Sequence, residues 1–569
     1  MLSSEQLPFD LAAGLVHWLI VCGAVLAVLA ITMTAVSLVT LGLTGPVFVV
    51  QQAVAGVKDF LQTSPRRVGA LTVLAVREAV RKKTLYVFYV FLALFLFAGW
   101  FLDSSTVDPE LRIREHVSFV LRTLSWVILP VALLLSCWSL PDDIKARSLH
   151  TVVTKPVRRN EVVFGRVLGI GIVASLILLI MGSIGYVWIY RQLPPAAREM
   201  LTARVPIWVT PDAPEARRQV PLVAGNEPSV IDSEVWSKLN FRFQNREGKN
   251  VAFGVNTGDE WMFRSYIEGN SQSKAIYRFQ RLTGRIPRDA QDLEFESTFQ
   301  VFRIHKGNID RGILCQLVLV NNARNIKVSL SPPFEVREFR SNRTKVPRKL
   351  VDDDGKDVEL LADLIHNGEL EVQVQCLTPG QFLGMARPDL FIRTPDRPFF
   401  VSYTKGVIGI WLMMTMIIVM GVMASCFAKG PVATLFTAAI WAFGRVSQNW
   451  MGELTGQIEL APGAVWKGGG PFESMWRIVA HMNPNVELED SIAKTVVQAM
   501  DAPIIKLIGG IQYIIPDFRI FNLAEYVANG FDVPFDVALL RGIAVTVGFA
   551  VPWIIVGYFS LKLRELEAK

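Results

Sequence analysis

Uncharged apolar runs recur along the chain and are separated by short blocks of charged residues. Five of the runs are about 18 to 24 residues long, which is enough to cross the hydrocarbon layer as a helix at ~1.5 Å per residue. They are Leu85–Leu102, Thr123–Pro141, Val167–Tyr190, Gly406–Ala428 and Gly542–Leu561. The pattern therefore predicts a polytopic, mainly α-helical membrane protein in which each run is a span.

Two further apolar runs bring the predicted total to about seven transmembrane helices. Gly430–Gly444 has 15 residues, so Arg445 must snorkel or Val446–Met451 must complete the crossing. The N-terminal run Leu11–Val57 contains no Lys, Arg, Asp or Glu, but Gly42–Pro46 interrupts it. We predict one helix over residues 12 to 41, followed by an interfacial stretch. A hairpin that crosses twice is the alternative.

Between residues 191 and 403 the pattern changes to an alternation of polar and apolar residues with a period of two. Such alternation is typical of strands with one buried face. It is clearest in Leu239–Phe243, Leu293–Val301, Ile326–Leu330 and Leu370–Cys376. Short strands separated by Gly, Pro and Asp turns predict a large inserted all-β domain, a sandwich or jelly roll.

Two segments of this domain depart from the strand pattern. Val358–Ile365 has mainly helical periodicity. Asp352–Asp357 has the carboxylate density of a calcium loop, but no bidentate Glu follows at the required offset. We interpret it as a hairpin turn.

The basic residues collect in blocks that predict the orientation of the chain. The net charge is +7 and the mean hydropathy +0.35. Lys and Arg are concentrated at residues 58 to 83 and 145 to 166, whereas Asp103–Val117 carries four acids and two arginines. The positive-inside rule places both basic blocks and the C-terminal tail in the cytoplasm, and residues 191 to 403 and 448 to 540 outside. Membrane topology thus accounts for the charge without a nucleic-acid partner.

The cytoplasmic loop at residues 141 to 166 carries the most informative motif. It has an amphipathic core, Leu149–Val153, and then reads Thr154-x-Pro156-Val157-x-Arg159-x-Glu161, followed by Gly165-Arg166. This loop resembles that of ABC transporter permease subunits of the type-2 export family, where Ser/Thr-x-Pro-Val-x-Arg-x-Glu precedes Gly-Lys. The chain departs from the family pattern at Arg147-Ser148, where Gly-Thr is usual, and at Arg166 in place of Lys.

The resemblance covers residues 68 to 190 and 404 to 569, and it implies roles for particular residues. Those implied to couple to an ATPase are Asp143, Arg147, Thr154, Lys155, Pro156, Arg158, Arg159, Glu161 and Arg166. Those implied to lie on an amphipathic elbow helix along the cytoplasmic face are Arg77, Arg81, Lys82 and Lys83. Ile514–Asn522 and Lys562–Glu565 resemble the closing pattern of the family.

These expectations divide the chain into seven parts. They are an extra N-terminal anchor at 1–57, the elbow helix at 58–84, three spans at 85–190 with the coupling loop 141–166, the extracytoplasmic β-domain at 191–403, two spans at 404–447, an extracytoplasmic loop with short helices at 448–540, and the last span with the cytoplasmic tail at 541–569.

The implied function is that of a permease subunit in the bacterial inner (cytoplasmic) membrane, coupling a separate ATPase to export. The expected partners are a cytoplasmic ABC ATPase, a second permease that is identical or different, and the lipid bilayer. ATP is expected in the partner, because the Gly-Lys pairs at 248 and 355 lack the flanking residues of a phosphate-binding loop. A membrane-anchored extracytoplasmic binding or scaffold protein is the alternative.

The remaining candidate residues give no enzyme signature. The six histidines show no His-x-x-x-His spacing, so neither a catalytic nor a metal site is predicted. Cys315 and Cys376 lie on apolar strand faces of the predicted outer domain and form a candidate disulfide. Two buried thiols that never meet are the alternative. Arg122 lies near the outer end of its span, either as a functional intramembrane charge or as a snorkelling side chain.

Overall fold

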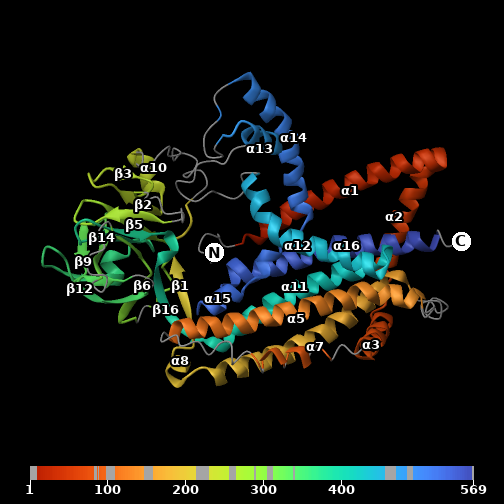
Figure 1. Ribbon diagram of the computed structural model, residues 1–569, viewed down its shortest axis with the longest axis horizontal. Coiled ribbons are helices and arrows are strands. Elements are labelled where there is room, and N and C mark those ends of the chain that lie inside the picture. Colours follow the sequence, from red (N-terminus) through yellow and green to blue (C-terminus); the bar gives the residue numbers. More distant parts are fainter. Residues whose placement is uncertain are drawn as a thin grey trace. The chain divides into compact units, whose positions relative to one another are not determined.

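The computed structural model describes the chain in two units, which are treated separately below (Figure 1). The described residues are 9–81, 86, 89–91, 93–95, 97, 109–145, 158–212, 230–255, 264–287, 290–303, 312–337, 340–454, 470–482, 488 and 491–566. The helical unit comprises Pro8–Ala203, Pro398–Met451 and Gly509–Lys569. The second unit contains Arg204–Arg397, which is rich in strands, and Gly452–Ile508.

Long helices dominate the helical unit. They are α1 (Leu11–Leu41), α2 (Gly45–Leu61), α3 (Pro65–Arg81), α5 (Pro109–Lys145), α7 (Arg159–Gln192), α11 (Phe399–Phe427), α12 (Gly430–Leu454) and α16 (Leu540–Leu566), with the short α8 (Pro195–Glu199), η5 (Phe518–Phe521), α15 (Ala524–Ala528) and η6 (Phe535–Leu539). α11 contacts α5, α16 and α7. In its most apolar stretch of 18 residues, 78% of the residues are buried, whereas none are buried in the corresponding stretch of α1. α11 is therefore the central helix of this unit.

Within the described residues, five helices are long and apolar enough to cross a membrane. They are Leu11–Val39, Pro109–Asp142, Arg159–Gln192, Phe399–Phe427 and Phe535–Lys562. α12 is a helix of 25 residues, but it includes Arg445 and Gln448 and is not among the five. The predicted span Leu85–Leu102 lies mostly outside the described residues. The count of seven therefore stays a prediction, while a helical chain with several candidate spans is confirmed.

The N-terminal run is helical on both sides of its predicted break. α1 ends at Leu41, Gly42–Thr44 form a single 3-10 turn, and α2 follows with Pro46 in its first turn. Gly42 has a φ of +64°, a left-handed value that favours glycine. The stretch predicted as interfacial is thus the helix α2.

Among the described residues, the strands of the second unit form four sheets, in which most neighbouring strands run antiparallel. The largest has the order β10 (Phe334–Val336), β8 (Ile313–Asn321), β14 (Leu370–Cys376), β5 (Lys274–Phe279), β2 (Phe241–Gln244), β3 (Asn250–Val251), with β9 (Ile326–Ser329) also on β8. The others are β1 (Thr202–Trp208), β16 (Leu390–Pro398), β6 (Asp292–Ser297), β11 (Asn342–Pro347); β4 (Ser265–Glu268), β15 (Gln381–Met385), β7 (Gln300–Arg303); and β12 (Lys349–Val351) with β13 (Asp357–Glu359). A separate β-rich region near residues 200 to 400 is confirmed. Its sandwich or jelly-roll arrangement stays a prediction.

Strand alternation locates most of these elements, with one division that the sequence does not reveal. The run Leu293–Val301 splits into β6 and β7, which belong to different sheets, and between them Thr298 donates its N–H to the carbonyl of Asp389 at 2.8 Å. The hairpin at Asp352–Asp357 is confirmed as the turn between β12 and β13. Within Val358–Ile365, residues Leu360–Leu364 form a π-helical turn.

The second unit also contains helices outside the sheets. They are α10 (Ser233–Lys238), α13 (Pro471–Val479), a 3-10 turn at Arg387–Asp389 and α14 (Ile492–Ile514), whose last residues belong to the helical unit. The buried carboxylate of Asp501 accepts the N–H groups of Phe472 and Glu473, at 2.9 Å each, at the start of α13. α14 has 23 residues and is longer than the short helices expected between 448 and 540.

Candidate functional site

The residues of the predicted coupling loop that the structure describes lie at the first turn of α7. Arg158 is the N-cap of this helix, and its backbone N–H donates to the Glu161 carboxylate at 3.0 Å. A carboxylate at the third helical position is favoured because it satisfies an N–H that has no partner within the helix. The local sequence Arg158-x-x-Glu161 thus determines where α7 begins.

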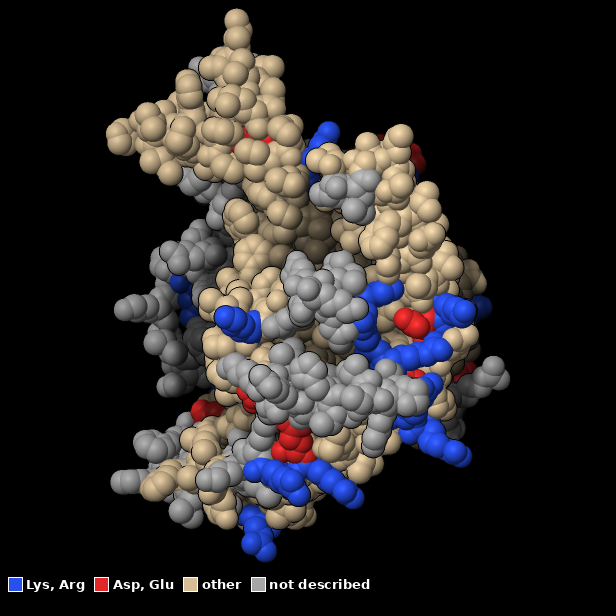
Figure 2. Space-filling view, turned by 90° about the vertical axis from the view of Figure 1, so that its right-hand side faces the viewer, with Lys and Arg blue, Asp and Glu red and all other residues tan. Residues whose placement is uncertain are grey.

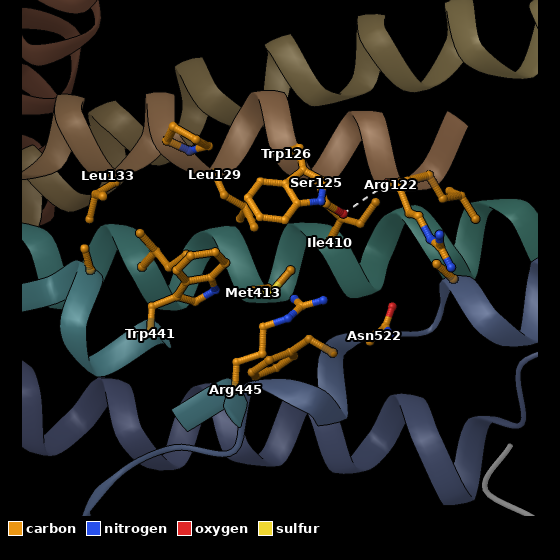
Figure 3. Close-up of a pocket in the computed structure, with 16 residues that line it drawn as sticks. Arg122, Ser125, Trp126, Leu129, Leu133, Ile410, Met413, Trp441, Arg445 and Asn522 are labelled. Atoms are coloured by element: carbon orange, nitrogen blue, oxygen red, sulfur yellow. Dashed lines mark hydrogen bonds between the residues drawn. The ribbon is translucent and has the colours of Figure 1, made fainter. Parts of the chain in front are cut away.

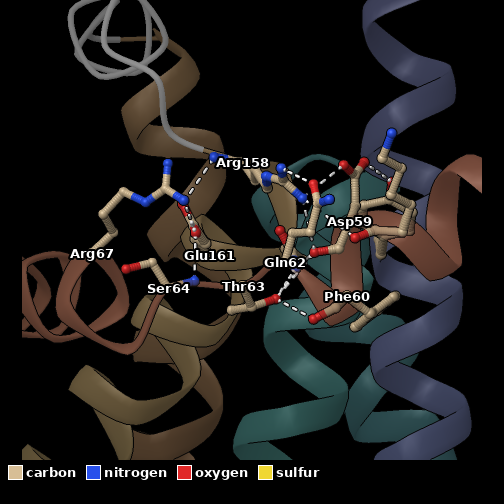
Figure 4. Close-up of polar contacts among 11 residues, drawn as sticks. Asp59, Phe60, Gln62, Thr63, Ser64, Arg67, Arg158 and Glu161 are labelled. Carbon is tan, nitrogen blue, oxygen red and sulfur yellow. Dashed lines mark hydrogen bonds and ion pairs between the residues drawn. The ribbon is translucent and has the colours of Figure 1, made fainter.

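Glu161 links this helix start to the turn between α2 and α3 (Figure 4). Its side chain is fully buried, with 0% exposed. Its Oε1 accepts the N–H of Ser64 at 2.9 Å and pairs with the Arg67 guanidinium at 3.1 Å. A buried carboxylate is tolerated only when its charge is paired and its lone pairs are hydrogen-bonded, as they are here. Glu161 therefore fastens α3 to α7.

A second branch of this network reaches α2 and α16. Arg158 Nη1 lies 3.4 Å from Asp59 Oδ1, and its Nη2 donates to the Gln62 side chain. The other Asp59 oxygen, Oδ2, accepts the hydroxyl of Tyr558 at 2.6 Å. Asn160 donates its amide N–H to the Asp59 carbonyl at 2.9 Å. The end of α2 is thus held by side chains of both α7 and α16.

Small residues bring α3 close to α7 one and two turns further along. A Cβ added to Gly165 would lie 2.5 Å from the Cβ of Leu71, and one added to Gly169 would lie 2.5 Å from the Cβ of Ala75. Both distances are shorter than side-chain packing permits, so the two helices approach this closely only with glycine at these positions. An ion pair between Arg166 of α7 and Glu78 of α3 also holds these two helices together.

The structure describes only part of the predicted site. It brings Arg158, Glu161 and Arg166 together with α2 and α3, and leaves Arg159 half-buried on the same turn. Asp143 lies in the last turn of α5, with its side chain outside the described set. Arg77 and Arg81 are exposed on α3. Those outside the described residues are Arg147, Thr154, Lys155, Pro156, Lys82 and Lys83.

Sequence reasoning missed the partners of these residues. They are Asp59, Gln62, Thr63, Ser64, Arg67, Glu78, Asn160 and Tyr558. Asp59 is the first carboxylate after the long uncharged N-terminal run, which marks it as unusual. No spacing rule connects position 59 with position 158, so the contact depends on how the helices pack.

Basic side chains gather on the face formed by these elements (Figure 2). Lys58, Arg66, Arg77 and Arg81 are exposed on α2 and α3. A face of this composition attracts anionic lipid head groups or the acidic residues of a partner protein. Within the described residues, no three His, Cys, Asp or Glu side chains come together as metal ligands.

The two cysteines of the second unit are brought directly opposite each other. Cys315 on β8 and Cys376 on β14 are cross-strand partners, and both are buried free thiols. Leu377 N–H donates to the Leu314 carbonyl at 2.9 Å, so the adjacent pair Cys315–Cys376 is of the non-hydrogen-bonded kind, in which side chains approach most closely. Burial raises the pKa of the Cys376 thiol to about 11 and also raises the pKa of Cys315. The two residues therefore lie directly opposite each other in the sheet, and a disulfide between them stays a prediction.

No family model, curated protein or solved structure that was compared with the chain matches it.

Proposed function

We propose that this chain is the membrane-spanning permease subunit of an ATP-driven ABC exporter. The observation that carries the proposal is the buried Glu161 network at the first turn of α7, immediately after the loop that resembles the family's coupling segment. In this proposal the cytoplasmic ATPase docks on Asp143–Glu161. The inner membrane of a bacterium is the proposed location, with a second permease, identical or different, completing the pathway.

The network provides a route by which ATP-driven movement reaches the spans. Force on the loop acts first on Arg158, the N-cap of α7. The contacts of Glu161 then transmit this force to α3, and the contacts of Asp59 transmit it to α2 and α16. Because the connecting groups are buried or paired, these helix ends move together rather than yielding one at a time. The bundle then opens a path for the substrate.

The basic face on α2 and α3 supports the proposed orientation. Positive residues flanking spans are retained on the cytoplasmic side, and an amphipathic helix with exposed arginines lies well along an anionic membrane surface. α3 fits this description, because Thr72, Ala75 and Ala79 are buried on one side and Arg77 and Arg81 are exposed on the other. The β-rich unit would then lie outside and receive or gate what emerges.

Co-purification with the ATPase tests the proposal. The full chain is co-expressed with an ATPase that carries phosphate-binding motifs and is encoded beside it, and the complex is isolated through a tag on the chain. Replacing residues 146 to 157 by a short Gly-Ser linker should abolish co-purification and the dependence of ATP turnover on this subunit. Shortening the Asp352–Asp357 hairpin is the matched control and should leave both intact. A complex that survives the loop replacement would remove the proposal.

A binding or scaffold protein held by membrane anchors is the second candidate. It is favoured by the second unit, in which residues of several sheets share one hydrophobic core, including Phe243, Tyr277, Phe295, Leu317 and Val372. A domain with its own core can recognise a ligand without help from the spans. Ligand binding that is unaffected by ATP, in cells without an adjacent ATPase, would favour this candidate.

A further inference from the structure

The helical unit contains a cavity of about 140 Å³ that the coupling network does not use (Figure 3). Three helices line it with residues spaced three or four apart, such as Arg122 and Trp126 on α5, Met413 on α11, and Trp441 and Arg445 on α12. The segment around Asn522 completes the wall. Spacing of three and four residues places side chains on one helix face, so the three faces converge on a single space.

Two arginines in this cavity have no anionic partner among the residues that the structure describes. Within the described residues, neither Arg122 nor Arg445 makes an ion pair or a hydrogen bond, and no carboxylate lines the cavity. Elsewhere in the same unit, Arg166 pairs with Glu78, and Lys405 lies 2.8 Å from Asp532. Both arginines are exposed in the structure, and charged residues on apolar helices often mark function. Two cations without a partner among the described residues thus line one cavity.

Neutral donors lie beside these charges. The indole N–H of Trp441 is buried and has no hydrogen-bond partner, and its ring packs edge-to-face on Trp126 with centroids 6.4 Å apart. A buried donor left unpaired is unfavourable, so this N–H favours a ligand that accepts a hydrogen bond from it. In Figure 3 both guanidinium groups point toward the part of the cavity where Asn522 lies. The site thus offers guanidinium, indole and amide N–H groups to one acceptor.

The rest of the cavity lining is mainly apolar, which limits further the kinds of ligand that the cavity can bind. Leu129, Leu133, Ile410 and Met413 form the wall beyond the tryptophans. Sites that enclose a whole small ligand have volumes of roughly 300 to 1,000 Å³, so this smaller cavity holds a head group and the first part of an apolar body. The positive-inside orientation places Arg122 and Arg445 at the outer ends of their apolar runs, level with lipid head groups.

We infer that this cavity binds the anionic head group, a carboxylate or a phosphate, of an amphiphile whose apolar part lies along α5 and α11. Arg122 and Arg445 hold the anion from two helices, and the Trp441 N–H donates to the same group. Charge-assisted hydrogen bonds from two guanidinium groups favour an anion over a zwitterion. The assignment of this amphiphile as the exported cargo rests on the proposed function, whereas the binding itself does not.

Binding to the purified full chain in neutral detergent tests the site. The probes are oleate, phosphatidylglycerol, phosphatidylcholine and inorganic phosphate, and bound ligand is measured by native mass spectrometry and by thermal shift. Oleate or phosphatidylglycerol should bind at least tenfold more tightly than phosphatidylcholine and inorganic phosphate. The double variant R122Q/R445Q should lose this preference, R122K/R445K should keep most of it, and Trp441→Phe should weaken binding by several-fold.

Arg114→Gln is the matched control, because Arg114 is exposed on the same helix and does not line the cavity. Equal binding of phosphatidylglycerol and phosphatidylcholine, or a double variant that binds as the wild type does, would overturn the site and leave snorkelling as the role of both arginines. Co-purification with the ATPase is scored separately. Anion binding without an ATPase complex would sink the export function and retain the site, and the reverse result would do the opposite.

Discussion

Two groups of arginines in the helical unit differ in what they contact. At the base of α7, Arg67 pairs with Glu161, Arg158 with Asp59 and Arg166 with Glu78. In the cavity between α5, α11 and α12, Arg122 and Arg445 have no such partner among the described residues. The first group is therefore paired within the chain, whereas the second group is exposed and, in our proposal, pairs with the anion of a bound ligand. The two groups thus differ in whether a carboxylate of the described residues lies beside each arginine.

The largest expected effect on stability is at the base of α7, where the arginines are paired. Glu161→Ala leaves the backbone N–H groups of Ser64 and Arg158 without their acceptor, and each unpaired donor costs about 1 to 3 kcal/mol; Arg67, whose side chain is 36% exposed, also loses its ion pair. We expect a markedly lower thermal unfolding temperature in detergent and loss of coupling to the ATPase. The exposed Glu199 on α8 supplies the control, Glu199→Ala, which should change neither. An unfolding temperature equal to that of the control would show that the Glu161 network contributes little to stability.

The next largest effect tests the close contact between α3 and α7. Gly165→Val forces a side chain against Leu71, and overpacking of this kind costs about 1 to 3 kcal/mol. Gly171→Val on the same helix meets nothing within 4 Å and should be tolerated. Unfolding of the two variants in parallel measures the difference. If both lose equal stability, helix propensity rather than the contact explains the result.

A much smaller effect on stability is expected in the cavity. R122Q/R445Q removes exposed charges that have no partner in the described part of the chain, so the unfolding free energy should change by less than about 1 kcal/mol or increase. The same variant should lose anion binding. Unfolding in ligand-free detergent, set beside Glu161→Ala, gives the measurement. A large destabilisation would mean that the cavity arginines are structural, and the contrast between the two groups would fail.

The smallest effect at neutral pH is expected from the buried thiol pair of the second unit, which carries no charge at all. Burial raises the pKa of Cys376 from 9.0 to about 11. Because the folded pKa lies above the unfolded one, its contribution to stability is fully present below pH 9 and is lost as the pH rises through about 11. Denaturant unfolding of the wild type and Cys376→Ala at pH 7, 9 and 10.5 isolates this contribution. A constant difference between the two proteins across that range would contradict the assigned burial.

The β-rich unit shows how far periodicity goes in prediction. Alternation predicted strands at Phe241, Ile326 and Leu370, where β2, β9 and β14 lie, because side chains on a pleated strand alternate between two faces whatever the fold. It did not predict that Leu293–Val301 divides between two sheets. Nor did it decide whether Cys315 and Cys376 lie opposite each other, since register is decided between strands and not within one.

For the helical unit, the sequence by itself determined where apolar helices run, where the chain breaks at Gly42, and that basic residues cluster on α2, α3 and the start of α7. Helix length and charge distribution can be predicted locally, because the thickness of the bilayer sets the length of a span and basic residues flank spans on the cytoplasmic side. Only the tertiary structure decided which arginines are paired. Glu161 accepts the N–H of Ser64, and Arg122 lines the same cavity as Arg445. Both arrangements arise because helices distant in sequence pack side by side. Such contacts depend on three-dimensional packing, which no spacing along the chain records.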